Sequence, residues 1–391
     1  MDASIRKRAN EGKKKMHDML DSMSESEENE SLSKTILKLA TCSAAGLLFG
    51  IAIEKGRVFE PLVIQDQMTM DRFIMVKMFL SAVSSGMFSF SVLSMIPATQ
   101  KKFQQASQVF ISGFSDKGLF SVGIGAAILG AGMTISGSCP GMVLVQVGAQ
   151  VPNSLYTFSG ALAGALLYGF IEPTVVRLTR PQYPLRTHYL HKYLGSPFSV
   201  VALPFGAVMA VIVFGLELFA PWKSELPKSV VESGGMALTR IAWPPFVAGG
   251  IIGCLQIPVL LAVGDTLGSS SSYCTVASQI LVSSPLQKMS PYLSKFKSGI
   301  SNWWQVLYIG GAIAGACFSA TASGTIGQAA GLSRTAAFSG GVLMVLGSRL
   351  AAGCTSGHGL SGMGLLSFLS MLAIPAMFMG GMATAAVVKI F

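Results

Sequence analysis

Long apolar segments constrain this chain more than any other feature of its sequence. Each approaches the roughly 20 residues that a helix needs to cross a bilayer core. The composition agrees: 51% of the residues are hydrophobic and only 12% are charged, whereas about a quarter are charged in soluble domains. The sequence predicts an all-α, multi-pass membrane protein. The expected spans are about 36–53, 71–96, 118–136, 154–174, 197–219, 243–263, 302–320, 335–351 and 370–388.

The first 34 residues have a different character. They contain seven Lys or Arg, eight Asp or Glu and almost no large apolar residues, so they cannot bury enough surface to offset the entropy cost of ordering. They also lack the apolar stretch of a signal peptide. We therefore expect 1–34 to be a disordered cytoplasmic tail and 35–391 to be the membrane domain.

Basic residues favour one side of the predicted membrane domain. With the N-terminus placed in the cytoplasm, the tail and the three loops on its side carry 17 Lys or Arg, whereas the three loops on the other side carry 7. Because cytoplasmic loops are enriched in Lys and Arg, the pattern predicts a cytoplasmic N-terminus. We expect the plasma membrane as the location.

Two segments share a spacing of glycines and a cysteine. Gly125, Gly132 and Cys139 follow a Gly-x6-Gly-x6-Cys pattern, and Gly340, Gly347 and Cys354 repeat it. The halves are expected at about 36–175 and 243–389, joined by a connecting segment at 176–242. Because five predicted spans begin before the second half, that half starts from the opposite face. The sequence therefore predicts an inverted repeat, an architecture found in many transporters.

Both patterns end in a Gly-rich turn in the middle of an apolar region. Such a turn survives at membrane depth only when it is buried in protein or lines a polar cavity. We expect two re-entrant segments, each with its cysteine near a helix start, where backbone N–H groups favour anions and thiolate character increases. The predicted substrate-binding residues of the turns are Gly137, Ser138, Cys139, Gly141, Gly353, Cys354, Thr355, Ser356, Gly357 and His358.

Three more residues leave alternatives open. His358 could act as a base or donor for Cys354, or it could fix the turn by bonding a backbone carbonyl. Arg349 is costly at membrane depth, and it could hold the turn or attract an anion. Cys274 follows a run of four serines and is a further candidate for substrate contact.

The remaining cysteines and the methionines do not indicate a bound cofactor. Cys42, Cys254 and Cys317 lie in apolar helix patterns and are interpreted as small packing residues. The six cysteines include no CxxC pair, which argues against a zinc site or a disulfide framework. The Met-rich stretch 67–78 could pass Cu(I), although methionine more often fills gaps between helices. We expect no cofactor, no metal and no nucleic-acid partner.

The turn sequences resemble those of a known family. GSRLAAGCTSGHGLSG at 347–362 resembles the signature of the YeeE/YedE sulfur-transport family, and GSCPGM at 137–142 and SSYCTVAS at 271–278 resemble its other cysteine segments. The resemblance implies an hourglass-shaped helical protein with a positively charged pathway, through which thiosulfate passes Cys139, Cys274 and Cys354 by transient S–H···S contacts. Bacterial members place the two halves in the opposite order, which would reverse the membrane orientation here.

Three functions follow as hypotheses. The first is transport of thiosulfate or a similar small sulfur anion, without enzymatic activity, with a cytosolic sulfur-carrier protein as a candidate partner. The second is a membrane-embedded sulfurtransferase that uses Cys354 and His358. The third is a soft-metal conduit, which the positive charge balance disfavours. Nothing in the sequence resembles a nucleotide-binding glycine loop, which argues against an ATP-driven pump.

Overall fold

The computed structural model describes residues 32–114, 117–179, 188–280 and 284–390. In these ranges the chain is helical, and the β-structure is one isolated antiparallel bridge between Tyr189 and Ser367. Most of the predicted tail, residues 1–31, lies outside the described residues. Eight described helices are long and apolar enough to cross a membrane, and a bent pair at 334–362 makes up to nine. The prediction of an all-α, multi-pass membrane protein is confirmed.

Each expected span corresponds to an observed helix or a broken pair of helices. In chain order these are α2 (Leu32–Lys55), α4 (Ile74–Met95), α6 (Leu119–Ser136), α8 (Ser154–Thr179), α10 (Phe198–Phe219), α13 and α14 (Pro245–Cys254 and Gln256–Val263), α18 (Ile300–Ala322), α19 and η1 (Arg334–Leu350 and Thr355–Gly362), and α20 (Phe368–Ile390).

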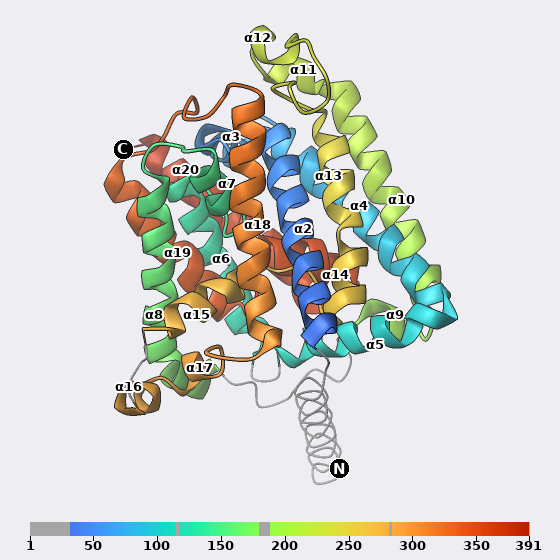
Figure 1. Cartoon of the computed structure of the whole chain (residues 1–391), viewed down its shortest axis with the longest axis vertical. Coiled ribbons are helices and arrows are strands. Elements are labelled where there is room, and N and C mark those ends of the chain that lie inside the picture. Colours follow the sequence, from blue (N-terminus) through green and yellow to red (C-terminus); the bar gives the residue numbers. More distant parts are fainter. Residues whose placement is uncertain (1–31, 115–116, 180–187, 281–283, 391) are drawn as a thin grey trace.

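Shorter helices mark the two ends of the bundle. Figure 1 shows one group at the lower end, which we call the α5/α17 face, and another at the upper end, the α3/α11 face. The lower group is α5 (Pro97–Ser112), α9 (Leu190–Tyr193), α16 (Ser284–Met289) and α17 (Pro291–Ser294). The upper group is α3 (Pro61–Met68), α11 (Trp222–Glu225) and α12 (Lys228–Val231). Helices α7 (Met142–Gly148) and α15 (Ser270–Ser278) both pack against α8 and α18.

The spanning helices pack as pairs drawn from distant parts of the chain. Helix α2 lies along α18, α4 packs between α13 and α10, and α6 packs between α19 and α20. Small residues allow these close approaches. A Cβ added to Gly46 or Gly50 of α2 would overlap the backbone of α18, so the two helix backbones touch directly, as small-residue interfaces permit in membranes.

The repeated glycine pattern lies where α6 meets α19. A Cβ on Gly132 would come 2.8 Å from the carbonyl oxygen of Gly340, and one on Gly347 would come 2.7 Å from that of Gly125. These four glycines therefore bring together the two helices that lead into the cysteine turns. The order of elements is also similar, with α6, α7 and α8 in one half and α19, η1 and α20 in the other. The inverted symmetry itself stays a prediction.

Candidate functional site

The first cysteine turn follows α6 and is fixed by glycine and glutamine. Gly137 ends the helix in the left-handed region (φ 54°), which glycine adopts without a steric penalty, and a Cβ there would lie 2.6 Å from Cβ of Pro61. Gln146 of α7 donates hydrogen bonds to the carbonyls of Gly137 (2.9 Å) and Phe59 (2.8 Å). The turn therefore places Cys139, which is 6% exposed, inside the protein.

The second cysteine turn follows α19 and has hydroxyl groups around its thiol. Sγ of Cys354 lies 3.1 Å from Oγ of Ser356 and 3.6 Å from Oγ of Ser269. The thiol is buried, since the residue is 1% exposed. A Cβ added to Gly357 would lie 3.9 Å from Sγ of Cys354, so this glycine leaves free space beside the sulfur.

The two turns meet beside α15 and the residue that precedes it. The Tyr273 hydroxyl donates a 2.6 Å hydrogen bond to the carbonyl of Pro140 in the first turn. On the other side, Ser269 contacts Cys354 and Ser356 of the second turn. The Thr355 side chain, from the second turn, lies beside the Cys139 thiol of the first. The structure thus brings together two cysteines that are 215 positions apart in the sequence.

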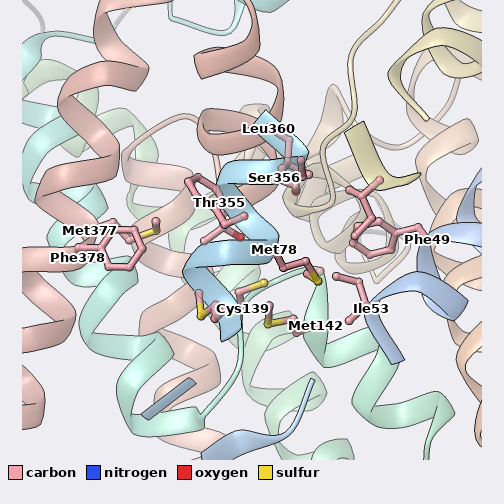
Figure 2. Close-up of a pocket in the computed structure, with 15 residues that line it drawn as sticks. Phe49, Ile53, Met78, Cys139, Met142, Thr355, Ser356, Leu360, Met377 and Phe378 are labelled. Carbon is pink, nitrogen blue, oxygen red and sulfur yellow. The ribbon is translucent and has the colours of Figure 1, made fainter. Parts of the chain in front are cut away.

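A small cavity opens beside Cys139 (Figure 2). Its volume is about 50 Å³, enough for about three or four water molecules, and none of its lining residues is charged. Figure 2 shows Cys139 with Met78 and Met142 near one another, with Thr355 and Ser356 above them. The lining residues are Phe49, Ile53, Met75, Met78, Phe79, Ala82, Cys139, Gly141, Met142, Ile252, Thr355, Ser356, Leu360, Met377 and Phe378.

Both ring nitrogens of His358 have partners other than the Cys354 thiol. One ring nitrogen, Nδ1, lies 3.1 Å from Oγ of Ser370, and the other, Nε2, lies 3.0 Å from the carbonyl oxygen of Ala351. A carbonyl can only accept, so Nε2 carries the hydrogen and Nδ1 accepts from the serine. Gly353 leaves room for this ring, since a Cβ there would lie 2.7 Å from Cδ2 of His358. In this structure the imidazole therefore fixes the turn.

Arg349 and Cys274 lie together, apart from the two cysteine turns. Nε of Arg349 donates to the Tyr292 hydroxyl (2.9 Å), and Nη1 donates to the hydroxyls of Ser270 (3.1 Å) and Ser271 (3.2 Å). The Cys274 side chain is fully buried beside Tyr292 and Arg349. Of the predicted cysteines, the structure therefore brings Cys139 and Cys354 together and places Cys274 in this second cluster.

Two further predicted residues of the first turn, Ser138 and Gly141, are buried. The Ser138 hydroxyl bonds the carbonyl of Cys139 (3.4 Å), while Gly141 faces Phe49 and Ser269. All six cysteines are free thiols. Within the described ranges, no group of three or more His, Cys, Asp or Glu could hold a metal ion.

A family model described as "Sulphur transport" matches residues 55–383, which include both cysteine turns and α15. The chain belongs to the sulphur transport family. A "Probable transporter" from Xylella fastidiosa (strain 9a5c) is 43% identical over 51 residues, covering 13% of this chain. In that match the chain spans 38% of the relative's length.

Some site residues of this sulphur transport family member cannot be identified from the sequence pattern. Ser269 and Tyr273 stand in the segment GSSSSYC, and the serine run is a signal for polar contact, but it does not say which serine meets which turn. The four methionines of the cavity come from three distant parts of the chain: Met75, Met78, Met142 and Met377. Tyr292 lies in the short helix α17, in a segment with no sequence pattern that would single it out.

Proposed function

We propose that this protein is a membrane transporter that passes thiosulfate, or a similar small sulfur-containing anion, along the thiols of Cys139 and Cys354. One observation carries the proposal: both Gly-rich turns deliver their buried thiols to the same place, joined by Ser269, Tyr273 and Thr355. That meeting point lies within a bundle of membrane-length helices. The family membership supports a sulfur substrate.

The chemistry of the meeting point suits weak, reversible contact. Thiols are weak hydrogen-bond donors and acceptors. The terminal sulfur of the anion can therefore move its contact from one thiol to the other, between Cys139 and Cys354, without being trapped. The hydroxyls of Ser269, Thr355 and Ser356 can donate to oxygen atoms of the same anion. A main cycle built on such contacts needs no covalent persulfide.

The proposed orientation follows the charge distribution of the loops. The N-terminus and the α5/α17 face are cytoplasmic, and the protein lies in the plasma membrane. The two halves act as an inverted repeat, in which the α6–α19 contact is the shared centre and the cysteine turns approach it from opposite sides. A cytosolic sulfur-carrier protein would meet the transporter at the α5/α17 face.

Uptake of radiolabelled thiosulfate by vesicles that contain the purified full-length protein tests the proposal. The variants are Cys139→Ala and Cys354→Ala, and the matched control is Cys254→Ala, which changes an exposed cysteine outside the site. We expect uptake by the wild type and the control, and little by the two turn variants. Normal uptake by both turn variants would rule out the cysteine route, and no uptake by the wild type would rule out thiosulfate transport.

The sulfurtransferase alternative has less support. It needs a base beside Cys354, and both ring nitrogens of His358 have other partners. Release of sulfite in the presence of an added thiol acceptor, without net uptake, would favour it over transport.

A soft-metal conduit has one observation in its favour. Four methionines and Cys139 line the same cavity, and thioether and thiolate ligands suit Cu(I). The cavity lining contains no acidic residue to attract a cation. A metal conduit therefore ranks below transport of a sulfur anion. Silver(I) uptake that is abolished by Met78→Leu, without any thiosulfate uptake, would reverse the ranking.

A further inference from the structure

A groove lies between α10 and α13, at a distance from the cysteine turns. Both helices pack against α4, and all three contribute to the lining of the groove. Its volume is about 390 Å³, which falls within the range of ligand pockets, roughly 300–1,000 Å³. Most of the lining comes from α10, through Ala210, Val213, Phe214 and Glu217, and α13 adds Phe246. The groove is therefore large enough to hold part of a ligand.

The α4 side of the groove presents no unsatisfied hydroxyl hydrogen. Ser81 donates a 2.7 Å hydrogen bond to the carbonyl of Phe246, and Ser84 donates a 2.8 Å hydrogen bond to the carbonyl of Gly206. The other lining side chains are apolar, apart from Glu217 at one end. An apolar chain can therefore lie in the groove without covering an unpaired polar group, which would be costly.

Helix α10 leaves the groove open to the bilayer. In Figure 1 this helix lies at the edge of the bundle, beside α4. Only 22% of the α10 span is buried inside the protein, against 56% of the α4 span. Val208, Val211 and Phe214 of α10 are exposed apolar residues. Acyl chains of the surrounding lipid can therefore reach the groove from the side.

The end of the groove at Glu217 carries an unbalanced negative charge. Lys77 of α4 is fully buried and pairs with two carboxylates, Glu217 (3.1 Å) and Glu225 of α11 (3.0 Å). One positive and two negative charges leave a net charge of −1. Among the described residues, neither carboxylate has a second cation within ion-pair distance. The Glu217 side chain is 24% exposed and that of Glu225 is 8% exposed, so a cation in the groove would meet Glu217.

We propose that the groove binds phosphatidylethanolamine, with an acyl chain along α10 and the ammonium group on Glu217. The ammonium supplies the missing positive charge and, like the lysine side chain, three N–H donors. Unbalanced charge is expensive at membrane depth, so this contact favours binding. Lys223, exposed on α11, can meet the lipid phosphate. A choline headgroup has the same charge but no N–H, so phosphatidylcholine binds more weakly. The site is independent of the proposed transport route.

Competition between two lipids with identical acyl chains tests the proposal. The purified full-length protein in detergent receives equal amounts of phosphatidylethanolamine and phosphatidylcholine, and native mass spectrometry measures how much of each stays bound. Glu217→Gln removes the charge and leaves Lys77 and Glu225 as a balanced pair, whereas Ala210→Trp fills the groove. Ala207→Trp is the matched control, because Ala207 is exposed on the same helix and does not line the groove.

We expect the wild type and Ala207→Trp to retain phosphatidylethanolamine over phosphatidylcholine by about ten-fold, the usual worth of a hydrogen bond to a charged group. Glu217→Gln should remove this preference. Ala210→Trp should reduce the binding of both lipids. Phosphatidylglycerol, which is anionic, should bind no better than phosphatidylcholine.

Equal retention of the two lipids by the wild type would overturn the proposal, and so would a preference that survives in Glu217→Gln. Preferred binding of phosphatidylglycerol would also contradict it. If the groove instead holds a second copy of the chain, light scattering will show a dimer that Ala210→Trp dissociates, and this result too would overturn lipid binding. Should Ala210→Trp fail to fold, the comparison of the wild type with Glu217→Gln still decides.

Discussion

Gly132 of α6 and Gly340 of α19 face each other so closely that a Cβ on Gly132 would lie 2.8 Å from the carbonyl oxygen of Gly340. The backbones of the two helices that carry the cysteine turns are therefore in direct contact. Any side chain at this contact would move one helix relative to the other, and with it the distance between Cys139 and Cys354.

The first prediction concerns this contact. Gly132→Ala should destabilise the protein by about 1–3 kcal/mol, the usual cost of overpacking, and should reduce thiosulfate uptake. Gly123→Ala is the control on the same helix, because a Cβ there meets nothing within 4 Å. Thermal unfolding in detergent and vesicle uptake measure the two effects. Equal behaviour of the two variants would show that the contact does not position the turns.

The second prediction concerns the link between α15 and the first turn. Tyr273→Phe removes the hydrogen bond to the Pro140 carbonyl and leaves the ring in place. Loss of one such bond costs about 1 kcal/mol, so the protein should fold but take up thiosulfate more slowly. Tyr156→Phe, which changes an exposed tyrosine of α8, should transport as the wild type does. Unchanged uptake in Tyr273→Phe would mean that the link is dispensable.

The third prediction concerns a buried ion network at the end of α2. Glu54 is fully buried, accepts hydrogen bonds from Ser319 (2.7 Å) and Thr325 (3.2 Å), and pairs with Lys55 (3.2 Å) and Arg57 (3.4 Å). Glu54→Gln leaves the buried Lys55 ammonium without its carboxylate, which costs about 3–5 kcal/mol, whereas Arg57 keeps its ion pair with Glu60. The midpoint of thermal unfolding should fall strongly, whereas exposed Glu232→Gln should have little effect.

The fourth prediction concerns pH. Burial, reinforced by the Lys192 ammonium, lowers the pKa of His191 to about 4 from an ordinary value of 6.5. The unfolded chain then binds a proton at a pH where the folded chain does not, so stability is lost as the pH falls from about 6.5 toward 4. The unfolding midpoint should drop between pH 7.5 and pH 5.

His191→Gln should make that drop smaller. Part of the pH dependence should remain in this variant, because burial also lowers the pKa of His188. A drop of equal size in the wild type and in the double variant His188→Gln, His191→Gln would show that other groups cause it.

The fifth prediction concerns orientation. Single cysteines are introduced as Lys101→Cys on α5 and Ser229→Cys on α12, both exposed, in a Cys254→Ala background. A membrane-impermeant maleimide added to intact cells should label position 229 and spare position 101. Labelling at 101 alone would place the N-terminus outside and reverse the proposed orientation.

The sequence by itself determined where this member of the sulphur transport family forms helices and where those helices are interrupted. Hydropathy is a property of each segment, and the cost of burying an unpaired backbone group acts locally. For this reason the predicted span 154–174 corresponds to α8, and the Gly-rich breaks at 137–141 and 351–354 appear where the glycines indicated. The Gly-x6-Gly-x6-Cys pattern also marked the two helices that touch.

Only the tertiary structure decided which side chains meet. The sequence left two roles open for His358, and packing of α20 against η1 supplied Ser370 as a partner for its ring. The sequence left the role of Cys274 open. In the structure Ser269 and Tyr273 contact the two turns, whereas Cys274 lies beside Arg349. These pairings join residues far apart in the chain, and they depend on how the helices pack, which no local pattern encodes.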